Sequence, residues 1–262
     1  MAGAPVSTKP DPQETNTNQF AFQTDDPVLA TSLEITSFLT YGDLEILTRM
    51  PWSSNQTFLV NVTQNNKTIQ GVYKPGKGER TLHDFPPNLY KREVAAYKLA
   101  QTLEWDLVPP TILRDGPFGE GSVQLYIPCD YNKHYFTVRD NPNSAYEITR
   151  LAAFDLIANN ADRKAGHVLV DPNDHLWAVD NALCFHHQFK IRTVIWDFAG
   201  TALPKNLLED LTRFIDVDIS QDLTDLLTNL EIDALITRTK ALMKEKYLPS
   251  DPSGQRIPWP IL

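Results

Sequence analysis

The chain has 262 residues, of which 24 are lysine or arginine and 33 are aspartate or glutamate, so its formal net charge is -9. Hydrophobic residues make up 42% and charged residues 22%, a globular composition that excludes a wholly disordered chain, a collagen or a coiled coil. The acidic balance argues against a general nucleic-acid binder, because such proteins carry a basic surplus. Two cysteines, Cys129 and Cys184, do not make a disulfide framework in a chain of this size.

The beginning of the chain shows no apolar run of signal-peptide length, and no stretch reaches the roughly 20 apolar residues of a membrane span. We therefore expect a cytoplasmic protein without stable membrane insertion. Residues 1–30 are rich in Pro, Thr, Asn, Gln and Asp and are expected to form a flexible tail.

The next part of the chain is predicted to be mainly strands. Strands are predicted, in chain order, at residues 44–48, 57–62, 68–74, 111–114 and 122–127. Residues 64–67 form a hairpin turn between the second and third of them. A helix is predicted over residues 90–103, because Tyr90, Val94 and Tyr97 are spaced for one face.

The second half of the chain is predicted to be mainly helical. Ser144 and Glu147 have the spacing of a capping box, which predicts a helix that continues to about Ala158. The elements expected after it are a polar loop at 159–166, short strands at 167–170 and 175–179, and helices after Pro204 and over 232–247.

This change of pattern predicts an α+β fold with two lobes. A β-rich N-lobe is expected over residues 31–128 and a mainly helical C-lobe over residues 129–248, followed by an irregular tail at 249–262. The lobes are expected to join near residues 126–130, with a ligand cleft between them.

Three segments carry side chains suited to phosphoryl transfer. That reaction needs a cation to hold nucleotide phosphates, carboxylates to hold a divalent metal, and a carboxylate to orient the attacking hydroxyl. Lys74, at the end of a predicted strand, suits the first task, and Glu93 at the start of the next helix is expected to pair with it. Asp180, at the end of another strand, suits the second task, and Asp162 in the polar loop suits the third.

The residues after Asp162 strengthen this interpretation. Lys164 lies two residues after it and His167 five residues after it. Protein kinases place a phosphate-neutralising lysine and a metal-binding asparagine at these offsets, and they use the same order of lysine, glutamate, loop aspartate and metal aspartate. We therefore predict that Asp162 and Lys164 are catalytic and that Asp180 and His167 bind metal.

Several motifs together resemble the catalytic domain of phosphatidylinositol 3- and 4-kinases. The closest in style are type II phosphatidylinositol 4-kinases and their bacterial relatives. The resemblance covers roughly residues 50–185. The motifs that carry it are Val72-Tyr-Lys-Pro75, Arg92-Glu-Val-Ala-Ala-Tyr97, Val123-Gln-Leu-Tyr126, Asn160-Ala-Asp-Arg163 and Ala178-Val-Asp-Asn-Ala-Leu183.

The resemblance implies an ATP-dependent kinase with ATP and Mg²⁺ or Mn²⁺ as its cofactors. Its γ-phosphate acceptor would be a hydroxyl of a protein, a small molecule or an inositol lipid, and the lipid ranks last because no membrane anchor is visible. The residues that it implies for nucleotide binding are Lys74, Glu93, Ser53, Ser54, Asn55, Gln124, Tyr126 and Ile127.

Two departures from the family pattern leave alternatives open. The phosphate-covering segment, residues 51–57, has no glycine, although backbone N–H groups of Ser53, Ser54 and Asn55 are able to bind phosphate. His167 replaces the usual asparagine. Three alternatives follow: His167 contacts phosphate, the site prefers manganese to magnesium, or the second metal ion is lost. The alternatives are a nucleotide-binding pseudokinase that acts as an interaction module and an AMP transferase on the same fold.

Overall fold

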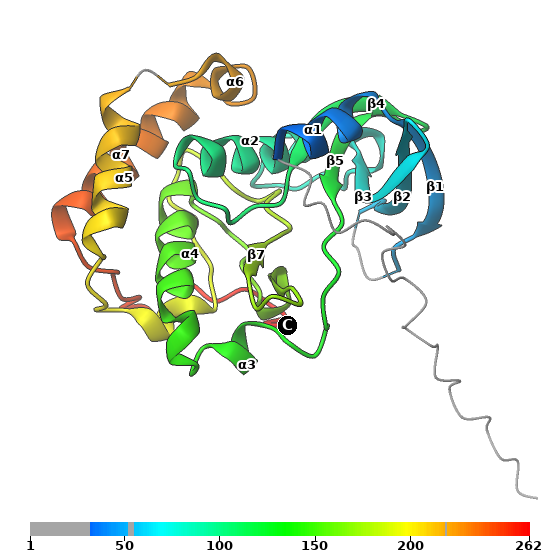
Figure 1. Cartoon of the computed structure of the whole chain (residues 1–262). Coiled ribbons are helices and arrows are strands. Elements are labelled where there is room, and N and C mark those ends of the chain that lie inside the picture. Colours follow the sequence, from blue (N-terminus) through cyan, green and yellow to red (C-terminus); the bar gives the residue numbers. More distant parts are fainter. Residues whose placement is uncertain (1–31, 52–54, 218) are drawn as a thin grey trace, which may run out of the picture.

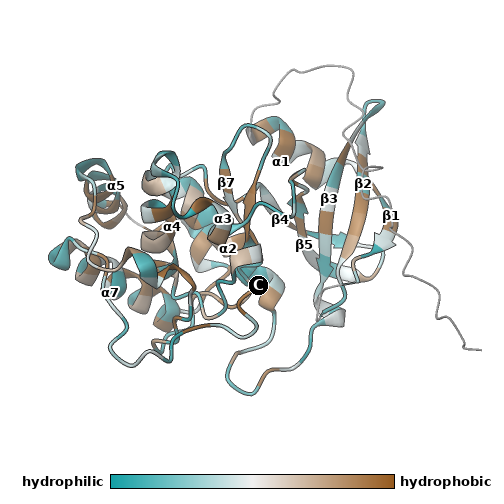
Figure 2. Ribbon diagram, turned by 90° about the horizontal axis from the view of Figure 1, so that it is seen from below, coloured by the Kyte–Doolittle hydropathy of each residue, from teal (hydrophilic) through white to brown (hydrophobic). Residues whose placement is uncertain are grey.

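The protein has the two-lobed α+β fold that the sequence predicts. A computed structural model describes residues 32–51, 55–217 and 219–262. The expected tail at 1–30, together with Ser53 and Ser54, lies outside these described residues. A five-stranded sheet occupies one end of the molecule, and α4, α5 and α7 gather at the other end (Figures 1 and 2).

The sheet end is built from antiparallel strands. Its elements are α1 (Ser32–Tyr41), β1 (Asp43–Arg49), β2 (Phe58–Gln64), β3 (Lys67–Pro75), α2 (Leu89–Thr102), β4 (Thr111–Gly116) and β5 (Gly119–Leu125). The strand order is β1-β2-β3-β5-β4. Asn65 and Asn66 connect β2 to β3 with φ of 52° and 61°, a left-handed turn that asparagine adopts readily and that suits a tight hairpin.

One face of the sheet is covered by α1, a helix that the sequence did not predict. Alternate residues of β2 turn toward this helix, as the two-residue period of a strand requires. The buried residues of this core are Leu39, Phe58, Val60, Val62, Tyr73, Ile112 and Val123. The sheet end therefore has a small apolar core of its own.

Helix α2 lies between the sheet and the helical end (Figure 1). The buried apolar residues of its second half belong to the same core as α4, α5 and α7 rather than to the core of the sheet; they are Ala95, Ala96, Tyr97, Leu99 and Ala100. Helix α2 follows strands in the sequence but packs into the helical lobe. It forms one side of the candidate active site.

The helical end holds the larger core. Its elements are α3 (Tyr135–Val138), α4 (Ala145–Ala158), β6 (Val168–Val170), β7 (Leu176–Ala178), α5 (Lys205–Asp216), α6 (Gln221–Thr224) and α7 (Asn229–Glu245). In α5, Leu207, Leu211 and Phe214 are buried at helical spacing, which explains why this segment is a helix. Residues 249–262 form no helix or strand, and the Ile261 carbonyl accepts a 2.8 Å hydrogen bond from the Ala165 N–H.

The capping box predicted at Ser144 is wrong. Ser144 has helical backbone angles and no capping hydrogen bond, because it already belongs to a 3₁₀ turn that starts at Pro142. Glu147 instead pairs with Arg150 within α4. A capping box does occur at α7, between Thr228 and Glu231.

Two further features of the described residues bear on function. No helix among them combines the length and the apolarity needed to cross a bilayer. A cavity of about 440 Å³ is lined by Ile35, Gln101, Trp177 and neighbouring residues, and the candidate site residues of the next section are not part of its lining.

Candidate active site

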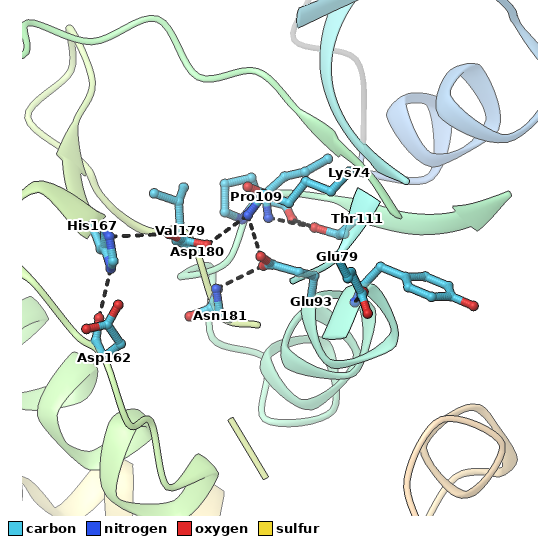
Figure 3. A network of polar contacts seen from close by, with 12 residues as sticks. Lys74, Glu79, Glu93, Pro109, Thr111, Asp162, His167, Val179, Asp180 and Asn181 are labelled. Carbon is cyan, nitrogen blue, oxygen red and sulfur yellow. Dashed lines mark hydrogen bonds and ion pairs between the residues drawn. The ribbon is translucent and has the colours of Figure 1, made fainter. Parts of the chain in front are cut away.

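The Lys74 ammonium is the centre of a contact between three elements (Figure 3). Lys74 lies near the end of β3, where hydrogen bonds to β2 and β5 fix its backbone. Its Nζ contacts the Glu93 carboxylate of α2 and lies 3.0 Å from Asp180 Oδ1. The predicted phosphate-binding pair, Lys74 and Glu93, and the predicted metal ligand Asp180 are therefore brought together.

The charges of this centre support one another. Burial alone would lower the pKa of Lys74, but the negative charges of Asp180 and Glu93 outweigh it and raise that pKa above its ordinary value. The Lys74 charge in turn holds the pKa of Asp180 well below its usual range. Lysine and aspartate are thus both ionised at neutral pH, as a site for phosphate and metal requires.

The backbone at Asp180 is shaped for this contact. Asp180 has a φ of 57°, in the left-handed region that aspartate and asparagine visit more readily than most residues. The N–H of the next residue, Asn181, donates a 2.9 Å hydrogen bond to Glu93 Oε2. Glu93 therefore holds the Lys74 side chain with one oxygen and the chain beside Asp180 with the other.

His167 lies between the two aspartates (Figure 3). Its Nδ1 is 2.9 Å from the Asp162 carbonyl oxygen, and its Nε2 is 3.3 Å from Asp180 Oδ2. Burial lowers the pKa of His167 to about 4, so the ring is neutral at pH 7. Because a carbonyl oxygen only accepts, we assign the proton to Nδ1, which turns the lone pair of Nε2 toward the Asp180 carboxylate.

This pair of facing electron donors fits a divalent cation. Within the described residues, no group of three or more His, Cys, Asp or Glu side chains is arranged to hold a metal. Asp180 and His167 could hold such a cation together with phosphate oxygens and water, the kind of ligand set in which Mg²⁺ binds beside a nucleotide.

Asp162 and Lys164 form an ion pair inside the polar loop. Asp162 Oδ2 lies 3.2 Å from Lys164 Nζ. The Asp162 N–H donates a 2.9 Å hydrogen bond to Asn160 Oδ1, which fixes the backbone of the loop. Burial raises the pKa of Asp162 above its ordinary value despite the nearby lysine, which makes it a better proton acceptor.

A buried arginine, for which the sequence predicted no role, supports this loop. The Arg163 side chain is fully buried and forms a 2.9 Å ion pair with Asp155 of α4. It also donates to Asn181 Oδ1 at 2.6 Å and to the Val179 carbonyl at 2.7 Å. Asp155 stands among apolar residues on the buried side of its helix, and a carboxylate there needs a partner, so this signal was present in the sequence.

A second support is Asn159, which ends α4 in the left-handed conformation. Its side-chain amide donates to the carbonyls of His186 and Gln188 at 2.8 and 2.7 Å and accepts from the Lys190 N–H at 2.8 Å. The loop that holds Asp162 is thus tied to the segment that follows Asp180.

Gln124 and Tyr126, which are also predicted to bind nucleotide, have hydrogen-bond partners within the protein. Gln124 lies on the same face of the sheet as Lys74, but its amide donates to Thr111 Oγ1 at 2.8 Å. The Tyr126 N–H donates to the Gln70 carbonyl at 3.0 Å, so this group is already bonded inside the lobe.

Two further residues that are predicted to bind nucleotide, Ile127 and Asn55, lie in loops. Ile127 is buried just after β5. Asn55 Oδ1 accepts from the Arg80 N–H at 2.9 Å, which joins the loop after β1 to the connection between β3 and α2. The contributions of Asn55, Tyr126 and Ile127 to nucleotide binding stay predictions.

Comparison with known proteins identifies one relative by sequence and similar folds among solved structures. No model of a known protein family matches the chain. The chain is 34% identical over 260 residues to Protein Rv2133c of Mycobacterium tuberculosis, an alignment that covers 85% of this chain and 93% of the mycobacterial protein.

Two solved structures match the chain at low sequence identity. The structure of hydra Fam20 with sugar matches with a TM-score of 0.51 and 14% identity, over 84% of this chain and 89% of Fam20. The Helicobacter pylori proinflammatory kinase CtkA matches with a TM-score of 0.45 and 12% identity, over 80% of this chain and 94% of CtkA. The likeness to Fam20 shows that the fold is a two-lobed, kinase-like fold.

Proposed function

The chain belongs to the same family as the mycobacterial Protein Rv2133c, and we propose that it is an ATP-dependent phosphotransferase that uses a divalent metal ion. The observation that carries this proposal is the ion-paired centre in which Lys74 contacts both Glu93 and Asp180. The kinase-like fold supports it, because the strand lysine, the helix glutamate and the metal aspartate occur in the order that kinases use.

The nucleotide side of the site is assigned to residues whose side chains already contact one another, namely Lys74, Glu93, Asp180 and His167. Lys74 would bind the phosphates, and Glu93 would keep its ammonium in place. Asp180 and His167 would hold Mg²⁺ or Mn²⁺. When bound, the metal ion would neutralise charge on the β- and γ-phosphates.

The acceptor side is assigned to the polar loop. The oxygen of an acceptor hydroxyl would attack the γ-phosphorus while the bond from that phosphorus to the β,γ-bridging oxygen breaks and ADP leaves. Asp162 would accept the hydroxyl proton, and Lys164 would neutralise charge on the transferred group. The raised pKa of Asp162 suits this role.

The acceptor is proposed to be a hydroxyl of a protein, a small molecule or an inositol lipid. Assignment to the phosphatidylinositol 3- and 4-kinases rests on the sequence motifs alone and stays a prediction. The ranking of protein and small-molecule acceptors before lipid acceptors also stays a prediction.

The test does not require a known acceptor. Purified protein is titrated with Mg²⁺–ATP by calorimetry, and ADP formation with water as the acceptor is measured with and without EDTA. Asp180→Asn is compared with Asp174→Asn, because both aspartates have positive φ, 57° and 61°, and asparagine tolerates that conformation.

The expected result is that Asp180→Asn and EDTA both abolish ADP formation. Asp174→Asn should match the wild-type chain, since Asp174 is an exposed turn residue paired with Lys133. A chain that binds no nucleotide, or an Asp180→Asn variant that retains full turnover, would reject the proposal.

One observation favours a second candidate, nucleotide binding without transfer. His167 presents an imidazole where an oxygen ligand would suit Mg²⁺ better. A protein that binds ATP but forms no ADP with either Mg²⁺ or Mn²⁺ would act as an interaction module. The mass of any modified acceptor further separates transfer of phosphate from transfer of AMP.

A further inference from the structure

Arg92 precedes Glu93 in α2 and contacts the helical lobe rather than Lys74. Its side chain is 5% exposed and donates to the Glu231 carboxylate, at the start of α7, and to the Cys184 carbonyl. The guanidinium also lies 5.5 Å from the centre of the Phe85 ring. Two neighbouring side chains of one helix thus point to two different partners, one in each lobe.

Glu231 is itself held rigidly. Its Oε2 accepts 2.9 Å hydrogen bonds from both the N–H and the hydroxyl of Thr228, and the first of these belongs to the capping box of α7. The other oxygen, Oε1, forms the ion pair with Arg92. Because this pair is buried, removing either partner leaves an uncompensated charge in a place that water does not reach.

The same two helix residues also hold the chain that follows Asp180. Glu93 accepts the N–H of Asn181, and Arg92 donates to the carbonyl of Cys184. Both ends of the segment 181–184 are therefore fixed by adjacent side chains of α2. The Leu183 carbonyl accepts a 2.9 Å hydrogen bond from the Ala161 N–H, which joins this segment to the loop of Asp162.

Kinases require this helix to be placed so that its glutamate meets the strand lysine. Here ten of the fourteen residues of α2 are buried, and its second half belongs to the helical core. A rotation of α2 would have to break the buried Arg92–Glu231 pair together with this packing.

We propose that Arg92 is a positioning residue of the phosphotransfer site. Its buried pair with Glu231 locks α2 to α7, so that Glu93 meets Lys74 and the chain after Asp180 keeps its conformation. The functional part of this inference rests on the proposed phosphotransfer, whereas the locking of α2 is a property of the chain without nucleotide.

The test uses two conservative variants and one matched control. Arg92→Lys keeps the charge but loses the forked contact, and Glu231→Gln keeps an oxygen for Thr228 but loses the ion pair. Lys98→Ala is the control, because Lys98 lies on the same helix and pairs with Asp222 of α6 at 2.7 Å on a more exposed side. Folding of each variant is checked by circular dichroism.

The first readout is hydrogen exchange of the Asn181 amide in the full chain without nucleotide. Both conservative variants should exchange this amide about tenfold faster than wild type, while amides of the β2–β3 hairpin keep their rates. The second readout is steady-state ADP formation, in which the KM for ATP should rise about fivefold as kcat falls. A smaller folded fraction alone would lower kcat and leave KM unchanged.

Unchanged Asn181 exchange and unchanged KM in both variants would overturn the proposal. Uniformly faster exchange across all amides would also overturn it, since that would show a general loss of stability. An equal effect in Lys98→Ala would do the same. If wild type forms no ADP, the proposed function fails, but the Asn181 exchange still decides whether Arg92 locks the helix.

Discussion

The two sides of the candidate site are positioned by different means. On the sheet side, Lys74 is placed by backbone hydrogen bonds of β3 with β2 and β5. On the loop side, Asp162 and Asp180 lie on segments outside helices and strands. Buried polar side chains hold those segments, and the set comprises Asp155, Asn159, Asn160, Arg163 and Asn181.

This difference has a physical reason. A strand satisfies its backbone groups by pairing, and its two-residue period then decides which side chains face the site. A buried loop has no ladder, so side chains must satisfy its backbone, and such networks are costly when one member is lost. Substitutions of supporting residues should therefore cost more on the loop side than on the sheet side.

The largest expected effect is on chemistry at the loop side. Asp162→Asn should lower turnover by about 10²- to 10⁴-fold, the usual contribution of a general base, with little change in ATP affinity. Wild-type kcat/KM should fall as the pH drops through the Asp162 pKa, which burial raises above its ordinary value, because only the ionised carboxylate accepts a proton. The asparagine variant should lack this acidic limb, and a pH profile with the same limb in both proteins would contradict the assignment.

The next effect concerns the support of the loop. Asp155→Ala leaves the Arg163 charge buried without its ion-pair partner and should lower the free energy of unfolding by about 3–5 kcal/mol. Urea denaturation followed by circular dichroism measures this loss. A loss below that of an ordinary surface substitution would show that the network does not hold the loop.

A smaller loss is expected where the support is uncharged. Asn159→Ala removes three side-chain hydrogen bonds to backbone groups of the segment 186–190, and it should lower the free energy of unfolding by about 1–3 kcal/mol. Hydrogen exchange of the Lys190 amide, which bonds to Asn159, should quicken more than exchange in α5. Equal changes in both places would argue against a local role.

The smallest effect is expected on the sheet side. Thr63 and Thr68 face each other across β2 and β3 with their hydroxyl oxygens 2.9 Å apart on an exposed surface. Thr63→Ala should therefore cost about 0.2–1 kcal/mol, since the backbone ladder continues to hold the strands. A thermal midpoint lowered as far as that of Asp155→Ala would break the contrast between the two sides.

The fold could be predicted from the sequence where apolar residues recur with a clear strand or helix period. The strands around Lys74 followed from alternation and from the turn at Asn65 and Asn66. Helix α1 was missed because, among its residues whose burial the structure describes, Leu39 alone is buried, so the helix carries little amphipathic signal. Helix α7 begins at Asn229 rather than at the predicted residue 232, because Thr228 and Glu231 form a capping box there.

The candidate site also has residues that could be predicted from the sequence and residues that could not. Lys74, Glu93, Asp162 and Asp180 could be predicted because their chemistry and order are distinctive, and the structure brings them together around Lys74 and His167. That Asp155 needs a partner could be predicted from its apolar neighbours on α4, but the identity of that partner, Arg163, could not, because folding supplies it. The predicted contributions of Ser53 and Ser54 lie outside the described residues.

A crystal structure with a non-hydrolysable ATP analogue and Mg²⁺ tests the central claim most directly. The account predicts phosphate oxygens within hydrogen-bond distance of Lys74 Nζ, the metal ion bound by Asp180, and the Asp162 carboxylate facing the γ-phosphate. A nucleotide bound away from Lys74, or a metal ion without Asp180 among its ligands, would contradict it.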